Sequence, residues 1–170
     1  MPMKHKVFIS YHHKNDEYYR NKFEELFGDL FINKCVHQGD INPNLKTDYI
    51  KRLIREDYIS DSSVVLVLLG TKTYCRKHVD WEIYAGLRKK AGLLGLILPT
   101  NEGYKKNEYN PNKIPPRLND NLESKYSKIF LWTEDKNKMK NRIESAFSNK
   151  KRKDHLINNS RKQFMNNRCE

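Results

Sequence analysis

The stretch "SVVLVLLG", residues 63–70, decides the fold of this chain because it is apolar without alternation. Its six consecutive aliphatic residues would make a strand that has no polar face. A strand of that kind belongs in the middle of a parallel sheet that helices cover on both sides. The stretch "LLGLILP" at 93–99 has the same character, and we expect it to lie beside the first.

Strand and helix patterns alternate on both sides of these two stretches. Further strands are expected at 6–12, 34–37 and 127–132, and helices at 15–31, 47–59, 78–90 and 134–148. A long polar loop is expected over 100–125. This alternation predicts an α/β, doubly wound fold with five parallel strands and helices on both faces. Because the most apolar strand is third in sequence, we expect the flavodoxin-like order 2-1-3-4-5.

The charge of the chain is large and unevenly distributed. The formal net charge is +12, and residues 148–170 alone contain seven Lys or Arg against two acids. We therefore expect one domain over 1–149 and a solvated basic tail over 150–170. A field that attracts nucleotides is a second interpretation of the charge. Nucleic-acid binding is not expected, since no DNA- or RNA-binding motif accompanies the charge.

Cysteine usage and hydropathy predict a cytoplasmic protein. Cys35, Cys75 and Cys169 are far apart and form no C-x-x-C pair, which is typical of a reducing compartment and offers no metal site. The N-terminus has no apolar signal region, and no run approaches the roughly 18 apolar residues that a membrane span needs. We expect no metal, no cofactor and no membrane partner.

The chain lacks the sequence motifs of several common nucleotide-binding and hydrolytic sites. There is no G-x-G-x-x-G after the first strand, no Walker sequence and no G-x-S-x-G. In the predicted topology, ligands bind where strands one and three end. Those ends carry residues 10–14 and 70–73, so a site is expected there.

Glu82 is the most informative acid near this point. In the first turn of the predicted helix it could simply interact with the helix dipole. However, the surrounding stretch is apolar on nearly every side, which would bury the carboxylate. Gly86 lies four residues later on the same face and would leave room for a ligand. A fixed carboxylate in such a place suits an oxocarbenium ion, which forms as a glycosidic bond breaks.

Three stretches resemble the bacterial TIR-like family, which includes the TIR proteins of Thoeris anti-phage defence. They are "KVFISYHHKND" at 6–16, the run from "DYIKRL" to "LILP" at 48–99, and "IPPRLNDNLESKYSKIFLW" at 114–132. The resemblance spans about 4–148. It implies a flavodoxin-like TIR fold and cleavage of NAD at the nicotinamide–ribose bond. The product would be a cyclic ADP-ribose isomer or an ADP-ribose conjugate that activates a partner effector protein.

The resemblance also implies roles for individual residues. It places the catalytic glutamate of the family's W-E motif at Glu82. It places the substrate pocket at Ser10, Tyr11, His12 and Trp81. Lys14 and Lys72, on the two loops at the switch point, could neutralise the diphosphate of NAD, which is the expected substrate.

Two alternatives to this enzyme remain open. In the first, the chain is a non-catalytic TIR interaction module that recruits partners through the loop 39–46, a loop that in TIR enzymes closes over substrate or meets a neighbouring subunit of a homo-oligomer. In the second, the chain transfers nucleosides. Trp81 has a structural interpretation as a core anchor, and His78 stands where relatives often carry a second Trp. Only an enzyme requires a carboxylate in an apolar pocket.

Overall fold

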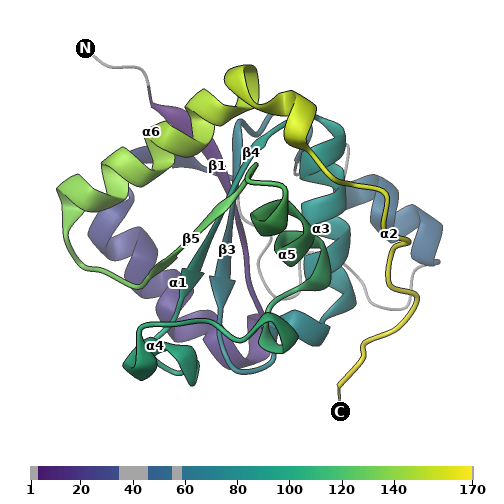
Figure 1. Ribbon diagram of the computed structural model, residues 1–170, viewed down its shortest axis with the longest axis horizontal. Coiled ribbons are helices and arrows are strands. Elements are labelled where there is room, and N and C mark those ends of the chain that lie inside the picture. The colour runs from purple at the N-terminus through teal and green to yellow at the C-terminus, as the bar shows by residue number, and fades with distance from the viewer. Residues whose placement is uncertain (1–3, 35–45, 55–58, 170) are drawn as a thin grey trace.

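A five-stranded parallel sheet forms the centre of the protein (Figure 1). The computed structural model describes residues 4–34, 46–54 and 59–169. The strands are β1 (His5–Ser10), β2 (Phe31–Asn33), β3 (Val64–Leu69), β4 (Gly92–Ile97) and β5 (Lys128–Leu131). Their order is β2-β1-β3-β4-β5, so the predicted flavodoxin-like α/β fold is confirmed.

Strand β3 occupies the middle of the sheet, as its continuous apolar run predicts. It pairs in parallel with β1, from Val7 opposite Val64, and with β4 along its whole length. All six of its residues are buried. Helices therefore cover both faces of β3, which is the arrangement that an all-apolar strand requires.

Two helical layers enclose the sheet (Figure 1). Helices α1 (His13–Phe27) and α6 (Lys136–Arg152) pack on one face. Helices α2 (Thr47–Leu53), α3 (Lys77–Arg88) and α5 (Pro116–Glu123) pack on the other. The last turn of α6 is basic, which is favourable at the negative end of a helix dipole. Each layer closes its own apolar core against the sheet.

The second strand differs from the expectation. It was predicted at 34–37 but lies at Phe31–Asn33, and α1 ends at Phe27 rather than at residue 31. The helical apolar pattern continues past the true end of α1 because Leu30 and Phe31 fall on its period. In the structure the Gly28 amide instead closes the helix on Glu24, and Phe31 begins the pairing with β1. Residues 35–37 lie outside the described part of the chain.

The polar loop expected over 100–125 contains three short helical elements. They are α4 (Gly103–Lys106), a 3-10 helix (Pro111–Lys113) and α5. Helix α5 begins with Pro116 at its first position, where a proline fits because its missing N–H would be unpaired anyway. It buries Arg117, Leu118 and Asn121, and two of these three are polar, so hydropathy gives little sign of the helix.

The expectation of a solvated tail is wrong for the residues that follow α6. Helix α6 continues to Arg152, a 3-10 helix follows at Asp154–Leu156, and the chain then returns along α5 and α3 toward the lower edge of the sheet (Figure 1). We call residues 158–169 the C-terminal segment. Its Phe164 is only 1% exposed, so an apolar side chain in this basic stretch packs into the body of the domain.

Candidate active site

A cleft lies at the carboxyl edge of the sheet, where β1 and β3 end and α1 and α3 begin. It has a volume of about 340 Å³. Its wall comes from the start of α1, the start of α3, one residue of α2 and one residue of the C-terminal segment. The lining residues are Tyr11, His12, His13, Lys14, Ile50, Arg76, Lys77, His78, Val79 and Asn167. The cleft thus occupies the switch point at which a flavodoxin-like sheet places its ligands.

Behind this cleft, a buried carboxylate bonds to a buried hydroxyl. Ser10 Oγ donates to Glu82 Oε1 at 2.8 Å, joining the end of β1 to the first half of α3. The two residues are 0% and 2% exposed. Burial raises the pKa of Glu82 to about 8, while the Ser10 hydrogen bond acts in the opposite direction. The predicted burial of Glu82 is therefore present in the structure.

Glu82 is close to the cleft without forming part of its wall. His78 and Val79 line the cleft, and Glu82 is one turn further along α3, on the same face as His78. The space expected beside Gly86 is absent, because a Cβ on Gly86 would lie 2.5 Å from Val65 Cγ2. Gly86 allows α3 to pack closely on β3, and it leaves no room for a ligand.

Two histidines of the cleft, His12 and His78, are neutral at pH 7. Burial lowers the pKa of His12 to about 4, and the positive charge of Arg76 contributes to the same shift. Burial likewise lowers the pKa of His78 to about 4, with Lys77 as the next cause. His12 Nδ1 accepts from the Asn15 amide at 3.1 Å and so caps α1. Lys14, Arg76 and Lys77 bring positive charge to the cleft.

Three of the predicted pocket residues, Ser10, Lys72 and Trp81, lie outside the cleft wall. Lys72 is exposed and precedes a 3-10 helix, Thr73–Cys75, that leads into α3. Trp81 is 1% exposed, and its Nε1 donates to the Phe164 carbonyl oxygen at 2.8 Å. The indole ring also lies 5.0 Å from Lys51 Nζ and is stacked near His78. These contacts favour the interpretation of Trp81 as a core anchor.

The fold agrees with a comparison against known protein families. Residues 8–103, more than half of the chain, match the family described as Thoeris protein ThsB, TIR-like domain. The chain belongs to this family. The match includes Ser10, Glu82 and all of the cleft wall except Asn167. A comparison with curated proteins finds no match.

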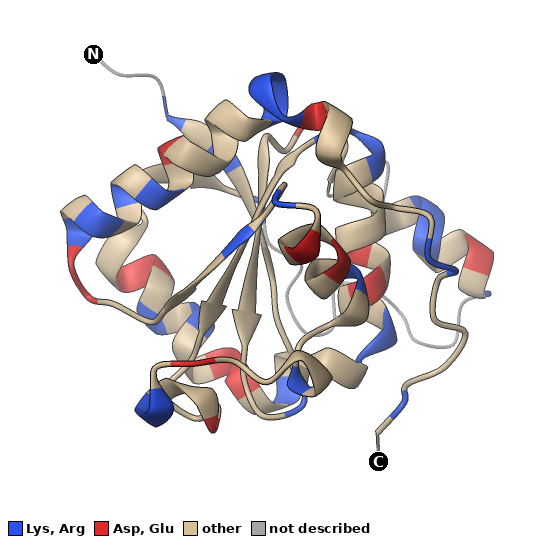
Figure 2. Cartoon of the chain, in the orientation of Figure 1, with Lys and Arg blue, Asp and Glu red and all other residues tan. Residues whose placement is uncertain are grey.

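The ThsB-type TIR domain has further cleft residues that the sequence did not single out. Arg76 and Lys77 stand at the first turn of α3, where Figure 2 shows basic residues, and both line the cleft with Lys14. The stretch "RKH" directly before "VDWE" could have indicated them, because it falls where α3 begins at the carboxyl edge of the sheet. The position of Asn167 has no such local signal.

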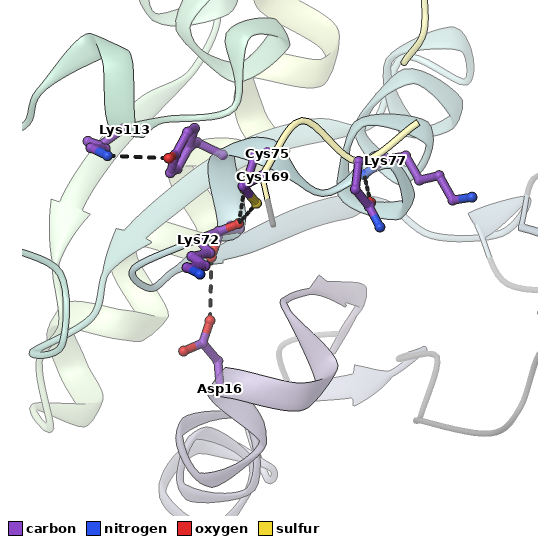
Figure 3. Close-up of a disulfide and its surroundings, with 9 residues drawn as sticks. Asp16, Lys72, Cys75, Lys77, Lys113 and Cys169 are labelled. Carbon is purple, nitrogen blue, oxygen red and sulfur yellow. Dashed lines mark hydrogen bonds between the residues drawn. A yellow bond between two sulfur atoms is a disulfide. The ribbon is translucent and has the colours of Figure 1, made fainter. Parts of the chain in front are cut away.

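Asp16 is a second buried carboxylate of this TIR domain near the switch point. It is 2% exposed and lies opposite Thr73, whose Oγ1 is 3.4 Å from Asp16 Oδ2 (Figure 3). Burial raises its pKa to about 6, and the Thr73 hydrogen bond opposes this rise. A Cβ on Gly70 would collide with the Asp16 carboxylate, so this group joins α1 tightly to the end of β3.

A buried ion pair fixes the outer side of α3. Arg117 Nε donates to Asp80 Oδ1 at 2.9 Å, and the two side chains are 0% and 1% exposed. Asp80 Oδ2 also accepts from the Phe164 amide at 2.8 Å. Asp80 therefore serves as a junction between α3, α5 and the C-terminal segment, and its role extends well beyond that of a helix-terminus acid.

The end of the C-terminal segment is attached beside the cleft. Cys169 forms a disulfide with Cys75, which precedes α3 (Figure 3). The wide spacing of the cysteines gives no indication of this pairing. The disulfide contradicts the expectation of cysteines typical of a reducing compartment for Cys75 and Cys169, and Cys35 lies outside the described residues.

The described ranges 4–34, 46–54 and 59–169 offer neither a metal cluster nor a membrane-spanning helix. They contain no group of three or more His, Cys, Asp or Glu side chains that could hold a metal ion. None of the helices in these ranges combines the length and apolar character needed to cross a bilayer. Apart from Lys46, which precedes α2, the predicted substrate loop 39–46 lies outside these ranges.

Proposed function

We propose that this TIR domain cleaves NAD at the nicotinamide–ribose bond and converts the ADP-ribose part into a signalling nucleotide, a cyclic ADP-ribose isomer or an ADP-ribose conjugate. The observation that carries this proposal is the buried Glu82 carboxyl group, hydrogen-bonded to Ser10 one turn behind a cationic cleft. Membership of the Thoeris family supplies the anti-phage context.

The charge of the cleft matches the diphosphate of NAD. Lys14, Arg76 and Lys77 lie on two sides of it, and His12 and His78 stay neutral. Tyr11 and His13 add an aromatic surface, with ring centroids 4.4 Å apart. Cations at the rim and aromatic rings within suit a dinucleotide, whose phosphates are anionic and whose bases are flat.

In the proposed reaction, the bond between the ribose C1′ and the nicotinamide nitrogen breaks, and its electron pair stays on nicotinamide. Positive charge then develops on the ribose, and an ionised Glu82 would stabilise it from an apolar, water-poor surrounding. A hydroxyl group or ring nitrogen forms the new bond to C1′. It belongs to the same ADP-ribose unit for a cyclic product and to a second molecule for a conjugate, and the proton that it loses passes to water. The cationic nicotinamide ring of the substrate favours the ionised carboxylate, because an opposite charge nearby lowers a carboxyl pKa.

In the Thoeris setting, we propose that phage infection starts production of the nucleotide. The nucleotide then activates an effector protein that is encoded beside this TIR protein. A cytoplasmic location and assembly into a homo-oligomer belong to the same proposal.

The decisive experiment compares cells that express the wild type with cells that express Glu82→Gln, both challenged with phage. Small molecules are filtered from the lysates and profiled by mass spectrometry for ADP-ribose derivatives. Glu134→Gln is the matched control, because Glu134 is exposed and lies ahead of α6, away from the cleft wall. We expect a new species in the wild type and the control, and a loss of about 100-fold in Glu82→Gln.

The other outcomes separate the alternative functions. Equal profiles in all three strains, with folded protein and confirmed infection, would leave the non-catalytic interaction module as the better explanation. Activity on free nucleosides that lack a diphosphate would instead favour nucleoside transfer, in which the three cations of the cleft have no partner.

A further inference from the structure

The C-terminal segment lies beyond the family match, yet it reaches the cleft. Its main chain is held at Phe164 by two consecutive side chains of α3. The Phe164 amide donates to Asp80 Oδ2 and its carbonyl oxygen accepts from Trp81 Nε1, each at 2.8 Å. The Arg168 guanidinium covers the Phe164 ring at 3.8 Å. The segment is thus attached firmly just before it arrives at the cleft.

The next residues cross the first turn of α3. The Arg168 amide donates to the Cys75 carbonyl oxygen at 2.8 Å, and Cys169 is bonded to Cys75. Between these points and Phe164, Asn167 Oδ1 accepts from the Lys77 amide at 2.9 Å (Figure 3). Lys77 is the first residue of α3, and Arg76 before it makes no capping bond with its own side chain. Asn167 supplies that cap from a distant part of the chain.

The same side chain forms part of the cleft wall next to the two cations at the start of α3. Because the Lys77 amide holds Oδ1, the plane of the Asn167 amide is set, and its Nδ2 is the polar end that remains for a ligand. Nδ2 can only donate a hydrogen bond, so it matches an acceptor such as a phosphate oxygen.

We propose that Asn167 is a substrate-binding residue that donates from Nδ2 to a phosphate oxygen of the dinucleotide placed by Arg76 and Lys77. This inference rests on the proposed function, since it takes NAD as the ligand. It makes the C-terminal segment a part of the active site, although the segment lies outside the matched domain. A role limited to capping α3 is the competing explanation.

Two substitutions separate binding from capping. Asn167→Asp keeps an oxygen for the Lys77 amide, and Asp is as good a helix cap as Asn. It replaces the donor by an anionic oxygen that would repel a phosphate. Asn167→Ala removes both groups. Asn166→Ala is the matched control, since Asn166 is an exposed neighbour that does not line the cleft.

The experiment measures NAD binding by calorimetry at pH 7 to the full chain carrying Glu82→Gln, so that the substrate stays intact. Melting temperatures of all variants are recorded in parallel. We expect Asn167→Ala to weaken binding about tenfold, as loss of a hydrogen bond to a charged group does. Asn167→Asp should weaken it further although its melting temperature does not fall, because an acid is favourable at a helix N-terminus. Asn166→Ala should bind like the parent.

Each other result has a distinct meaning. If the parent binds NAD and Asn167→Asp binds it equally well or better, the proposal for Asn167 is overturned whatever Asn167→Ala does, whereas the proposed function stands; weaker binding by Asn167→Ala alone means that the side chain only caps α3. If neither the parent nor the wild type binds NAD, the proposed function fails and the role of Asn167 fails with it.

Discussion

Replacing Glu82 by glutamine should stabilise the protein increasingly as the pH rises. Glutamine has nearly the same shape and keeps an oxygen that can accept from Ser10 Oγ. The wild-type carboxyl titrates near 4.5 when unfolded, and burial raises its pKa to about 8 in the folded state. Between these values the folded protein retains a proton that the unfolded chain has released. Raising the pH through this window therefore destabilises the wild type, and an amide does not respond.

The size of the effect follows from the same two pKa values. One pH unit corresponds to about 1.4 kcal/mol. From pH 5 to pH 8, the stability difference between Glu82→Gln and the wild type should grow by about 4 kcal/mol, and above pH 8 it should level off. For a domain of this size that difference corresponds to roughly 10 °C in melting temperature.

Urea unfolding at half-unit pH steps from 5 to 9 measures this difference directly. His12, His78 and Asp16 also have shifted pKa values, but they titrate in both proteins and cancel in the comparison. Glu134→Gln, in the exposed position before α6, should show a difference that does not depend on pH. A flat difference for Glu82→Gln as well would refute the reasoning, because it would mean that water solvates the carboxylate in the folded protein.

Three further predictions concern the reaction and the packing of α3. In the wild type, kcat/KM for nicotinamide release from NAD should rise about tenfold per pH unit up to about pH 8, because the free enzyme must first ionise Glu82. A kcat/KM profile that stops rising near pH 4 would contradict this. Arg117→Met should lower the free energy of unfolding in urea by about 3–5 kcal/mol, since it leaves Asp80 buried without its ion-pair partner. Adding Asp80→Asn should recover part of that loss, and a double variant no more stable than the single one would argue against the ion pair as its cause. Gly86→Ala should cost about 1–3 kcal/mol because its Cβ would meet Val65 Cγ2 at 2.5 Å. Val65→Ala in the same chain should relieve that strain, as urea unfolding would show.

The strand order could be predicted because it follows from the pattern of apolar residues along the sequence. The unbroken apolar run of β3 requires cover on both faces, and that requirement leads to the central position and the strand order. Helix α5 escaped prediction because what it buries includes Arg117 and Asn121, whose partners lie far away in sequence. The position of β2 was missed because the apolar period of α1 continues through Leu30.

The candidate site was predictable where it depends on local sequence. The apolar neighbours of Glu82 on α3 indicate its burial, and the end of β1 indicates Ser10 as a facing group. Tyr11 and Lys14 follow β1 directly and do line the cleft. By contrast, the position of Asn167 in the cleft depends on hydrogen bonds to the main chain of Phe164. Every residue has main-chain groups of this kind, so the sequence does not indicate the contact.

The three consecutive residues Asp80, Trp81 and Glu82 make contacts with two different parts of the molecule. Neighbouring residues on a helix point about 100° apart, so each of the three faces a different part of the molecule. Asp80 and Trp81 hold the C-terminal segment, while Glu82 faces Ser10. If Glu82 serves the proposed reaction, a relative without that reaction would be expected to keep the Asp-Trp pair and exchange the glutamate. A relative without the C-terminal segment would be expected to keep the glutamate and to carry other residues in place of the Asp-Trp pair.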